Sequence, residues 1–156
     1  MHLERAHGGE VERLAREGHL IDMPYVVKGM DFSFSGLLTF AEKALAEQRR
    51  EDVAYSFQEH AFSMIAEAAE RALMITGKEE VLLCGGVAQN ERFKEILRGM
   101  CEENGVRFYV PPDEFNRDNG GMIAYTGYYM LERMGGRLRG IDLNIRPLYR
   151  IEEVEL

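Results

Sequence analysis

Apolar residues follow two different spacings along this chain, and together the spacings predict an α/β fold. Helical spacing, with apolar positions three and four residues apart, runs through residues 53–75 and again through residues 93–100. A continuous apolar run at residues 81–84 predicts a buried strand, and a second apolar run at residues 106–110 predicts another strand. The order strand, helix, strand predicts a crossover unit, in which ligands collect at the carboxyl ends of the strands.

The pattern predicts further elements on both sides of this unit. Helices are expected at residues 11–15, 37–45 and 122–131, and a short strand is expected at residues 32–35, where Phe and Ser alternate.

Helix boundaries follow from residue type. Ser35 and Asp52 are the expected N-caps of the helices that begin after them, and Gly77 is the expected left-handed residue past the long helix. Lys28, Ser33 and Ser35 fit two explanations equally well. They either contact phosphate or substrate oxygens, or they belong to a plain edge strand that leads into a helix.

Paired glycines and single polar residues follow the two strands of the crossover unit. Gly85 and Gly86 come directly after the first strand, and glycine lets a bound group approach the backbone. Asn90 lies just past that turn and Asp118 lies past the second strand, so the unit predicts a ligand site. Asp118 also precedes a predicted helix, and spacing alone makes it either an N-cap or a metal ligand.

A second glycine pair stands near the start of the chain. Gly8 and Gly9 precede a helical pattern, where backbone N–H groups can face an anion or a hydroxyl, although an ordinary turn is the simpler explanation. Glu12 lies inside that helix, and its spacing alone predicts a surface carboxylate.

Composition supports one folded domain and narrows its partners. The chain has 156 residues, 46% of them hydrophobic, and a net charge of −8, which argues against wrapping nucleic acid by bulk charge. Five arginines between Arg133 and Arg150 form either a small positive patch for RNA or an acidic partner, or a solvated basic edge. Two cysteines are too few for a disulfide framework, so a reducing cytoplasm is expected. No apolar run reaches the roughly 18 residues of a transmembrane helix, and the start of the sequence lacks the apolar stretch of a signal peptide.

Three motifs in a fixed order carry a resemblance to a known family. They are Lys-Gly-Met-Asp-Phe-Ser-Phe-Ser-Gly-Leu at residues 28–37, Gly-Gly-Val-Ala-Gln-Asn at residues 85–90, and Val-Pro-Pro at 110–112 with Arg-Asp-Asn-Gly-Gly-Met-Ile-Ala-Tyr-Thr-Gly at 117–127. Their order and spacing span nearly the whole chain and resemble the enzymes that synthesise threonylcarbamoyladenosine in tRNA, above all the catalytic subunit of the archaeal and eukaryotic KEOPS complex.

This resemblance implies a fold and an activity. The fold would be an actin-like ATPase domain, of the kind shared by actin, sugar kinases and the chaperone ATPase, with helices on both faces of a small sheet. The activity would be transfer of a threonylcarbamoyl group from threonylcarbamoyl-adenylate to N6 of the adenosine beside the anticodon of tRNA. An adenine nucleotide or threonylcarbamoyl-adenylate would therefore be bound.

The family's motifs assign residues to that nucleotide. Asn90, after the Gly85-Gly86 turn, matches a residue that binds the adenosine moiety. Gly8 or Gly9, together with Glu12, matches residues that face the ribose.

The family's metal site extends beyond this chain. By the same match Asp118 would be a ligand of a catalytic iron or zinc ion, which polarises the acyl carbonyl as a Lewis acid. The family's His-x-x-x-His pair and tyrosine belong to a first half that has no counterpart in this sequence. Residues 1–156 therefore resemble the C-terminal half of a two-domain protein. By this resemblance the chain would contribute Asp118 to the metal site, and the missing half would contribute the other ligands. We expect the chain alone to transfer no threonylcarbamoyl group, because catalytic metals usually have three protein ligands.

The resemblance also implies partners, and it leaves other functions open. The expected partners are tRNA and the kinase-like and dimerising subunits of a KEOPS-type complex, with no membrane. An incomplete sheet predicts exposed apolar edges and self-association. The other functions are a kinase or carbamoyltransferase of the same ATPase superfamily, a zinc metalloprotease, for which this sequence lacks the His-x-x-x-His pair, and a non-catalytic binding module for partner subunits.

Overall fold

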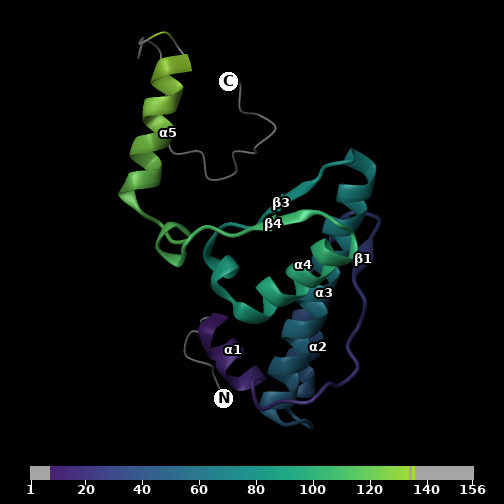
Figure 1. The fold of residues 1–156 in the computed structure, drawn as a ribbon. Coiled ribbons are helices and arrows are strands. Elements are labelled where there is room, and N and C mark those ends of the chain that lie inside the picture. Colours follow the sequence, from purple (N-terminus) through teal and green to yellow (C-terminus); the bar gives the residue numbers. More distant parts are fainter. Residues whose placement is uncertain (1–7, 134, 136–156) are drawn as a thin grey trace. The chain divides into compact units, whose positions relative to one another are not determined.

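The structure is a computed structural model that describes residues 8–133 and residue 135. The chain divides into two compact units, Met1–Asn116 and Arg117–Leu156. In the described residues, helices α1 to α4 and strands β1 to β4 belong to the first unit, and helix α5 belongs to the second (Figure 1). None of these helices is long and apolar enough to cross a membrane.

Helix α1 (Gly8–Ala15) packs against α3 (Arg50–Thr76), the longest helix of the first unit. The prediction of a glycine turn ahead of this helix is wrong, because Gly8 and Gly9 form the first turn of α1 itself. Backbone N–H groups of a first turn have no intrahelical partner, so glycine disturbs the helix least at that position.

The segment that follows α1 is held against α3 by hydrogen bonds from its backbone N–H groups to side chains of α3. The N–H of His19 donates to Oδ1 of Asp52 over 2.8 Å, and the N–H of Ile21 donates to Oγ of Ser56 over 2.7 Å. The predicted N-cap role of Asp52 is therefore wrong: α3 begins at Arg50, and the Asp52 carboxylate serves the neighbouring segment instead. Ser56 is completely buried beneath this segment.

The far end of α3 agrees with the prediction. Gly77 has φ 62° in the left-handed region, and its N–H donates to the carbonyl oxygen of Leu73 over 2.9 Å. Along the predicted apolar stripe Val53, Ala61 and Ala68 are buried, whereas Ile75 is 75% exposed at the last turn.

A small hairpin precedes α2. Strand β1 (Val27–Lys28) pairs antiparallel with β2 (Asp31–Phe32), and Gly29 makes the turn with φ 65°. The predicted strand at residues 32–35 is therefore only partly right, because α2 (Ser35–Ala44) begins with Ser35 inside the helix. Ser35 is not the N-cap that was predicted; its hydroxyl lies 3.0 Å from the hydroxyl of Ser33.

The predicted strand–helix–strand unit is present. Strand β3 (Glu80–Leu82) lies parallel to β4 (Arg107–Tyr109), with Val81 opposite Phe108, and α4 (Glu91–Glu103) connects them after the short 3₁₀ turn η1 (Gly86–Gln89). The core between this unit and α3 consists of these buried residues: Ala66, Leu73, Phe93, Leu97, Met100 and Cys101.

The two-stranded sheet is covered on one face only within the first unit. Val81 and Phe108 pack against the core, whereas Leu82 is 65% and Tyr109 is 47% exposed on the other face. The prediction of a buried strand at residues 81–84 is wrong for the residues described in this unit, because Leu82 and Cys84 are exposed. Helices on both sheet faces remain a prediction. The expected exposed apolar surface is present.

An ion pair lies across the same open face of the sheet. Nη2 of Arg107 and Oε1 of Glu80 are 2.6 Å apart, and the two residues are direct neighbours in the strand register. This pair therefore stands next to Leu82 and Tyr109 on the uncovered side.

Helix α5 (Gly120–Arg133) forms the described part of the second unit. The helix confirms the prediction made from the apolar stripe at residues 122–131. Its N-cap is Asn119, whose Oδ1 accepts a hydrogen bond from the N–H of Met122 over 2.8 Å.

Candidate functional site

The turn after β3 depends on glycine for its backbone shape. Gly85 has φ 100° and ψ 176°, a conformation that side-chain-bearing residues rarely adopt. No atom lies within 4 Å of a Cβ built on Gly85 or Gly86, so both glycines border open space. The turn therefore leaves its backbone approachable, as the glycine pattern predicted.

Asn116 joins the ends of the two strands. Its Oδ1 accepts from the N–H of Gly85 over 3.3 Å, and its Nδ2 donates to the carbonyl oxygen of Pro111 over 2.9 Å. The residue is only 3% exposed. Asn116 could not be predicted as a site residue, because nothing in a single sequence distinguishes a bridging Asn from a solvated one.

Asn90 is the N-cap of α4. Its Oδ1 accepts from the N–H of Phe93 over 3.0 Å, and its Nδ2 donates to Oε1 of Gln58 over 2.9 Å. Gln58 belongs to α3 and is 6% exposed. The side chain that was expected to bind adenosine is thus engaged by two protein groups, one on each side of its amide.

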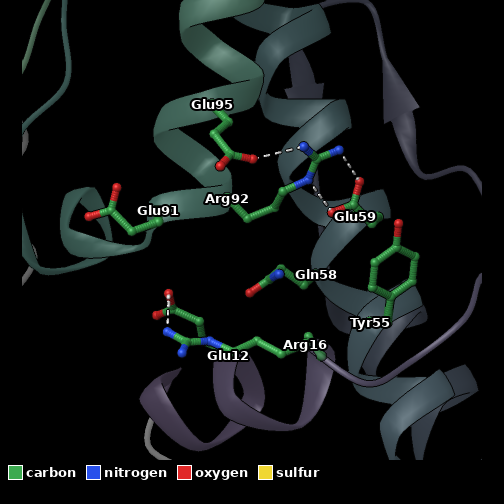
Figure 2. A pocket seen from close by; sticks show the side chains of 9 residues that line it. Glu12, Arg16, Tyr55, Gln58, Glu59, Glu91, Arg92 and Glu95 are labelled. Carbon is green, nitrogen blue, oxygen red and sulfur yellow. Dashed lines mark hydrogen bonds and ion pairs between the residues drawn. The ribbon is translucent and has the colours of Figure 1, made fainter.

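A cavity of about 330 Å³ opens beside this amide pair (Figure 2). Helices α1, α3 and α4 and the residue after α1 surround it. Its lining residues are Glu12, Ala15, Arg16, Tyr55, Gln58, Glu59, Glu91, Arg92 and Glu95.

The cavity gathers some of the predicted site residues and leaves others outside. Glu12 lines it, and so do the hydrogen-bond partner and the chain neighbour of Asn90, which are Gln58 and Glu91. The glycines that were expected to contact a nucleotide do not line it: Gly8, Gly9, Gly85 and Gly86.

Carboxylates outnumber guanidinium groups on the cavity wall. Arg92 forms a two-pronged contact with Glu59, at 2.6 Å and 2.8 Å, and a third hydrogen bond with Glu95 at 3.0 Å. These hydrogen bonds, first to Glu59 and then to Glu95, raise the pKa of Arg92 above its ordinary range. The charge of Arg92 is therefore already compensated by the protein.

Glu12 is held more loosely. Its Oε1 lies 3.9 Å from Nη2 of Arg16, and its side chain is 23% exposed. No hydrogen bond from the described residues reaches this carboxylate, which leaves its oxygens able to accept from a ligand.

Asp118 lies in the second unit, just before α5. It is exposed, and it borders a shallow pocket together with Asn119, Gly120, Met122 and Ile123. The alternative that Asp118 caps the helix is wrong, since Asn119 takes that role. Within residues 8–133 and 135, no group of three His, Cys, Asp or Glu side chains is arranged to hold a metal ion.

Part of the basic stretch lies outside the described residues. Of the five arginines from Arg133 to Arg150, only Arg133 is described, and its guanidinium donates to the hydroxyl of Tyr129.

A model of one family matches most of the chain. The family is described as TsaD, tRNA N6-adenosine threonylcarbamoyltransferase, and the match covers residues 1–125.

Curated relatives extend this similarity to the whole chain. A tRNA N6-adenosine threonylcarbamoyltransferase from Archaeoglobus fulgidus is 50% identical over 100% of this chain and 49% of the relative. A probable bifunctional tRNA threonylcarbamoyladenosine biosynthesis protein from Methanocaldococcus jannaschii is 52% identical over 100% of this chain and 29% of the relative. The chain thus spans about half the length, or less, of these relatives.

A solved structure shares the fold. The crystal structure of HypF from T. kodakarensis superposes with a TM-score of 0.64 and 27% sequence identity, over 85% of this chain and 18% of that one. The α/β class predicted from the apolar spacings is confirmed.

Proposed function

The chain belongs to the tRNA N6-adenosine threonylcarbamoyltransferase family, and from this membership we propose that it supplies part of the active site of such an enzyme. The reaction moves a threonylcarbamoyl group from threonylcarbamoyl-adenylate to N6 of the tRNA adenosine beside the anticodon. The new bond joins N6 to the carbamoyl carbon, the bond from that carbon to the phosphate oxygen breaks, and AMP and one proton leave.

One observation carries the proposal that this chain binds the nucleoside part of the adenylate. Glu12 from α1 lines the same cavity as Gln58 from α3 (Figure 2). Gln58 is in turn the hydrogen-bond partner of Asn90, the N-cap of α4, so segments far apart in the sequence contribute to this cavity. One residue assigned to the nucleotide by its motif, Glu12, and the hydrogen-bond partner of a second, Asn90, thus lie at one cavity, whose volume is in the range of small-molecule sites.

The charge of the cavity wall favours the nucleoside end of the adenylate over its phosphate end. The four carboxylates of the cavity disfavour a phosphate, and Arg92 is already neutralised by Glu59 and Glu95. A carboxylate such as Glu12 accepts hydrogen bonds from ribose hydroxyls. The cavity therefore suits the uncharged nucleoside, with the phosphate directed away from it.

The metal ion of the proposed enzyme does not fit the described residues alone. Three protein ligands are usual in a catalytic site, and no group of three forms within residues 8–133 and 135. Asp118 is proposed as one ligand of an iron or zinc ion because it is exposed and its carboxylate is not used as a helix cap. The remaining ligands would come from outside these residues.

The wider context of the chain is part of the same proposal. It would correspond to the C-terminal half of a two-domain actin-like ATPase fold, in keeping with its span of 49% of the Archaeoglobus fulgidus relative. Kinase-like and dimerising subunits of a KEOPS-type complex would be its partners in the cytoplasm, and tRNA its substrate.

The test compares the chain alone with the chain co-expressed with the remaining part of the Archaeoglobus fulgidus relative. Each is incubated with unmodified tRNA and threonylcarbamoyl-adenylate, and threonylcarbamoyladenosine is measured by mass spectrometry. We expect the pair to form the product and the chain alone to form none. A soluble pair that forms no product overturns the proposal, and product formed by the chain alone overturns the view that it is half a site.

A matched substitution connects the activity to the cavity. Glu12→Gln removes the anionic acceptor and should lower product formation by the pair about tenfold or more, since a hydrogen bond to a charged group contributes roughly 1.5–3 kcal/mol. Glu114→Gln, at an exposed position away from the cavity, should leave it unchanged.

A second candidate function is binding of partner subunits without catalysis. The uncovered face of the β3–β4 sheet, with Leu82 and Tyr109 exposed, favours it. Co-purification with partner subunits, together with no product from the assembled pair, would support this function and exclude the first.

A further inference from the structure

The hydrogen-bond directions around Asn90 are fixed by the backbone of α4. A backbone N–H can only donate, so the atom of Asn90 that faces the N–H of Phe93 must be the oxygen Oδ1. The other end of the Asn90 amide is then the donor Nδ2, which points to Gln58 over 2.9 Å. The atom of Gln58 that meets it must accept, and is therefore Oε1.

These donor and acceptor assignments leave one polar atom of the two amides without a partner among the described residues. Nε2 of Gln58, a donor of two hydrogen bonds, has no partner among the described residues. No side-chain nitrogen or oxygen in those residues is both fully enclosed and unpartnered, so Nε2 must reach open space. Gln58 is 94% buried, being 6% exposed, and it lines the cavity. The open space that Nε2 reaches is therefore the cavity.

The surroundings of Gln58 make this donor distinctive. Figure 2 shows its amide between the Glu12–Arg16 pair on one side and the Arg92–Glu59 contact on the other. The two guanidinium groups of the wall are paired with carboxylates, and the remaining polar atoms are mainly carboxylate oxygens, which accept. Besides the hydroxyl of Tyr55, Nε2 is thus a neutral donor that the wall presents to a ligand.

We infer that Gln58 binds the nucleoside directly, by donating from Nε2 to an uncharged acceptor such as a ribose oxygen or an adenine ring nitrogen, and that Asn90 is a positioning residue that holds this amide in its donating orientation. The inference rests on the proposed function and extends that function by naming Gln58 as a group that recognises the nucleoside. Glu12 then accepts from a hydroxyl while Gln58 donates, so the wall recognises a group that can do both, which a ribose does.

Two isosteric substitutions separate binding from positioning. Gln58→Glu keeps an oxygen for Nδ2 of Asn90 but replaces the cavity donor with an acceptor. Asn90→Asp keeps the cap on Phe93, yet presents an oxygen to Gln58, so the Gln58 amide turns round and directs Oε1 into the cavity. Both variants preserve side-chain volume, and Gln48→Glu, at an exposed position outside the cavity, controls for the added charge.

The experiment titrates adenosine into the full 156-residue chain and follows the side-chain amide signals by NMR. We expect the Gln58 amide to shift on addition of adenosine, and both Gln58→Glu and Asn90→Asp to weaken adenosine binding about tenfold with Gln48→Glu unchanged. The positioning role has its own readout without ligand: Asn90→Asp should slow hydrogen exchange at the Gln58 amide, which becomes bonded to a carboxylate.

The outcomes keep the two claims apart. Adenosine binding that is unchanged in Gln58→Glu overturns the binding role, and an unchanged Gln58 amide in Asn90→Asp overturns the positioning role. The absence of any adenosine binding by the unsubstituted chain overturns the inference as a whole. The proposed function fails separately, by the absence of threonylcarbamoyladenosine in tRNA treated with the assembled pair.

Discussion

A Cβ atom on Gly18 would lie 2.1 Å from the backbone carbonyl oxygen of Glu51, a distance that no real Cβ tolerates. The segment after α1 therefore depends on glycine for its approach to α3. Gly18→Ala should force the two apart and lower the free energy of unfolding by about 1–3 kcal/mol, as overpacking usually does. Urea denaturation followed by circular dichroism measures the loss.

Gly99 provides the matched control. It lies within α4, and no atom is within 4 Å of a Cβ at this position. Gly99→Ala should raise the free energy of unfolding by about 0.5–1 kcal/mol, because alanine loses less backbone freedom in a helix. Equal effects of the two substitutions would contradict the close approach at Gly18.

Asn116 holds together the loops that follow β3 and β4. Asn116→Ala leaves the N–H of Gly85 and the carbonyl oxygen of Pro111 without their partners, and should cost about 1–3 kcal/mol. Faster hydrogen exchange at the Gly85 amide would locate the loss, and Glu114→Ala, at an exposed neighbouring position, should leave the exchange rate unchanged. The bridge is absent in solution if the Gly85 amide exchanges equally fast in both variants.

The two cysteines should differ sharply in reactivity. Cys84 is exposed and Cys101 is fully buried, and burial raises the pKa of the Cys101 thiol. Iodoacetamide, which reacts with the thiolate, should label Cys84 in the folded protein and Cys101 only after unfolding. Mass spectrometry of the labelled peptides across a urea series checks this, and equal protection of both thiols would contradict the burial.

The raised pKa of Cys101 also predicts a pH dependence with a definite sign. In the unfolded chain the thiol loses its proton near its ordinary pKa of roughly 8.5, while the folded state still binds it. The stabilising contribution is therefore complete below that pH and is lost as the pH rises through the higher folded value. Urea midpoints measured from pH 7 to 10 should fall at the alkaline end, and less so in Cys101→Ala.

Asn119 and Asp118 should behave differently although they are neighbours. Asn119→Ala removes the cap on the N–H of Met122 and should destabilise α5 by about 0.5–2 kcal/mol. Asp118→Ala should change helix stability by less than about 0.5 kcal/mol, because this side chain is exposed and does not cap the helix. Hydrogen exchange at residues 121–123 distinguishes the two, and a larger effect from Asp118→Ala would reverse the assignment.

Apolar spacing predicted the elements well, and polar residues predicted the helix ends less well. The crossover unit has strong local signals, so β3, α4 and β4 appear where residues 81–110 indicated them. A polar residue near a helix start has several possible partners, and sequence does not show which one is near. Asp52 accepts from His19 through a tertiary contact, and Asn119, the direct neighbour of Asp118, caps α5 locally.

The candidate site shows the same limit. Glu12 and Asn90 were identified from motifs, whereas Gln58 was missed because a glutamine on a long amphipathic helix is usually solvated. Its importance comes only from the contact between α3 and α4, which brings it within 2.9 Å of Asn90. Exposed apolar surface was expected from an incomplete sheet, but the exposure of Leu82 was not, since exposure depends on what packs above a strand and not on the strand itself.

The ion pair between Glu80 and Arg107 should make self-association of the chain depend on salt concentration. It is the charged part of an otherwise apolar strip that includes Leu82 and Tyr109, and charged side chains keep such strips from pairing with other copies. Dissolved salt screens charges that are more than about 8–10 Å apart at ordinary ionic strength, and molar salt screens them within about 3 Å. Concentrated salt should therefore cause the folded protein to cluster and scatter light well below its melting temperature, so low ionic strength is the better condition for handling this chain.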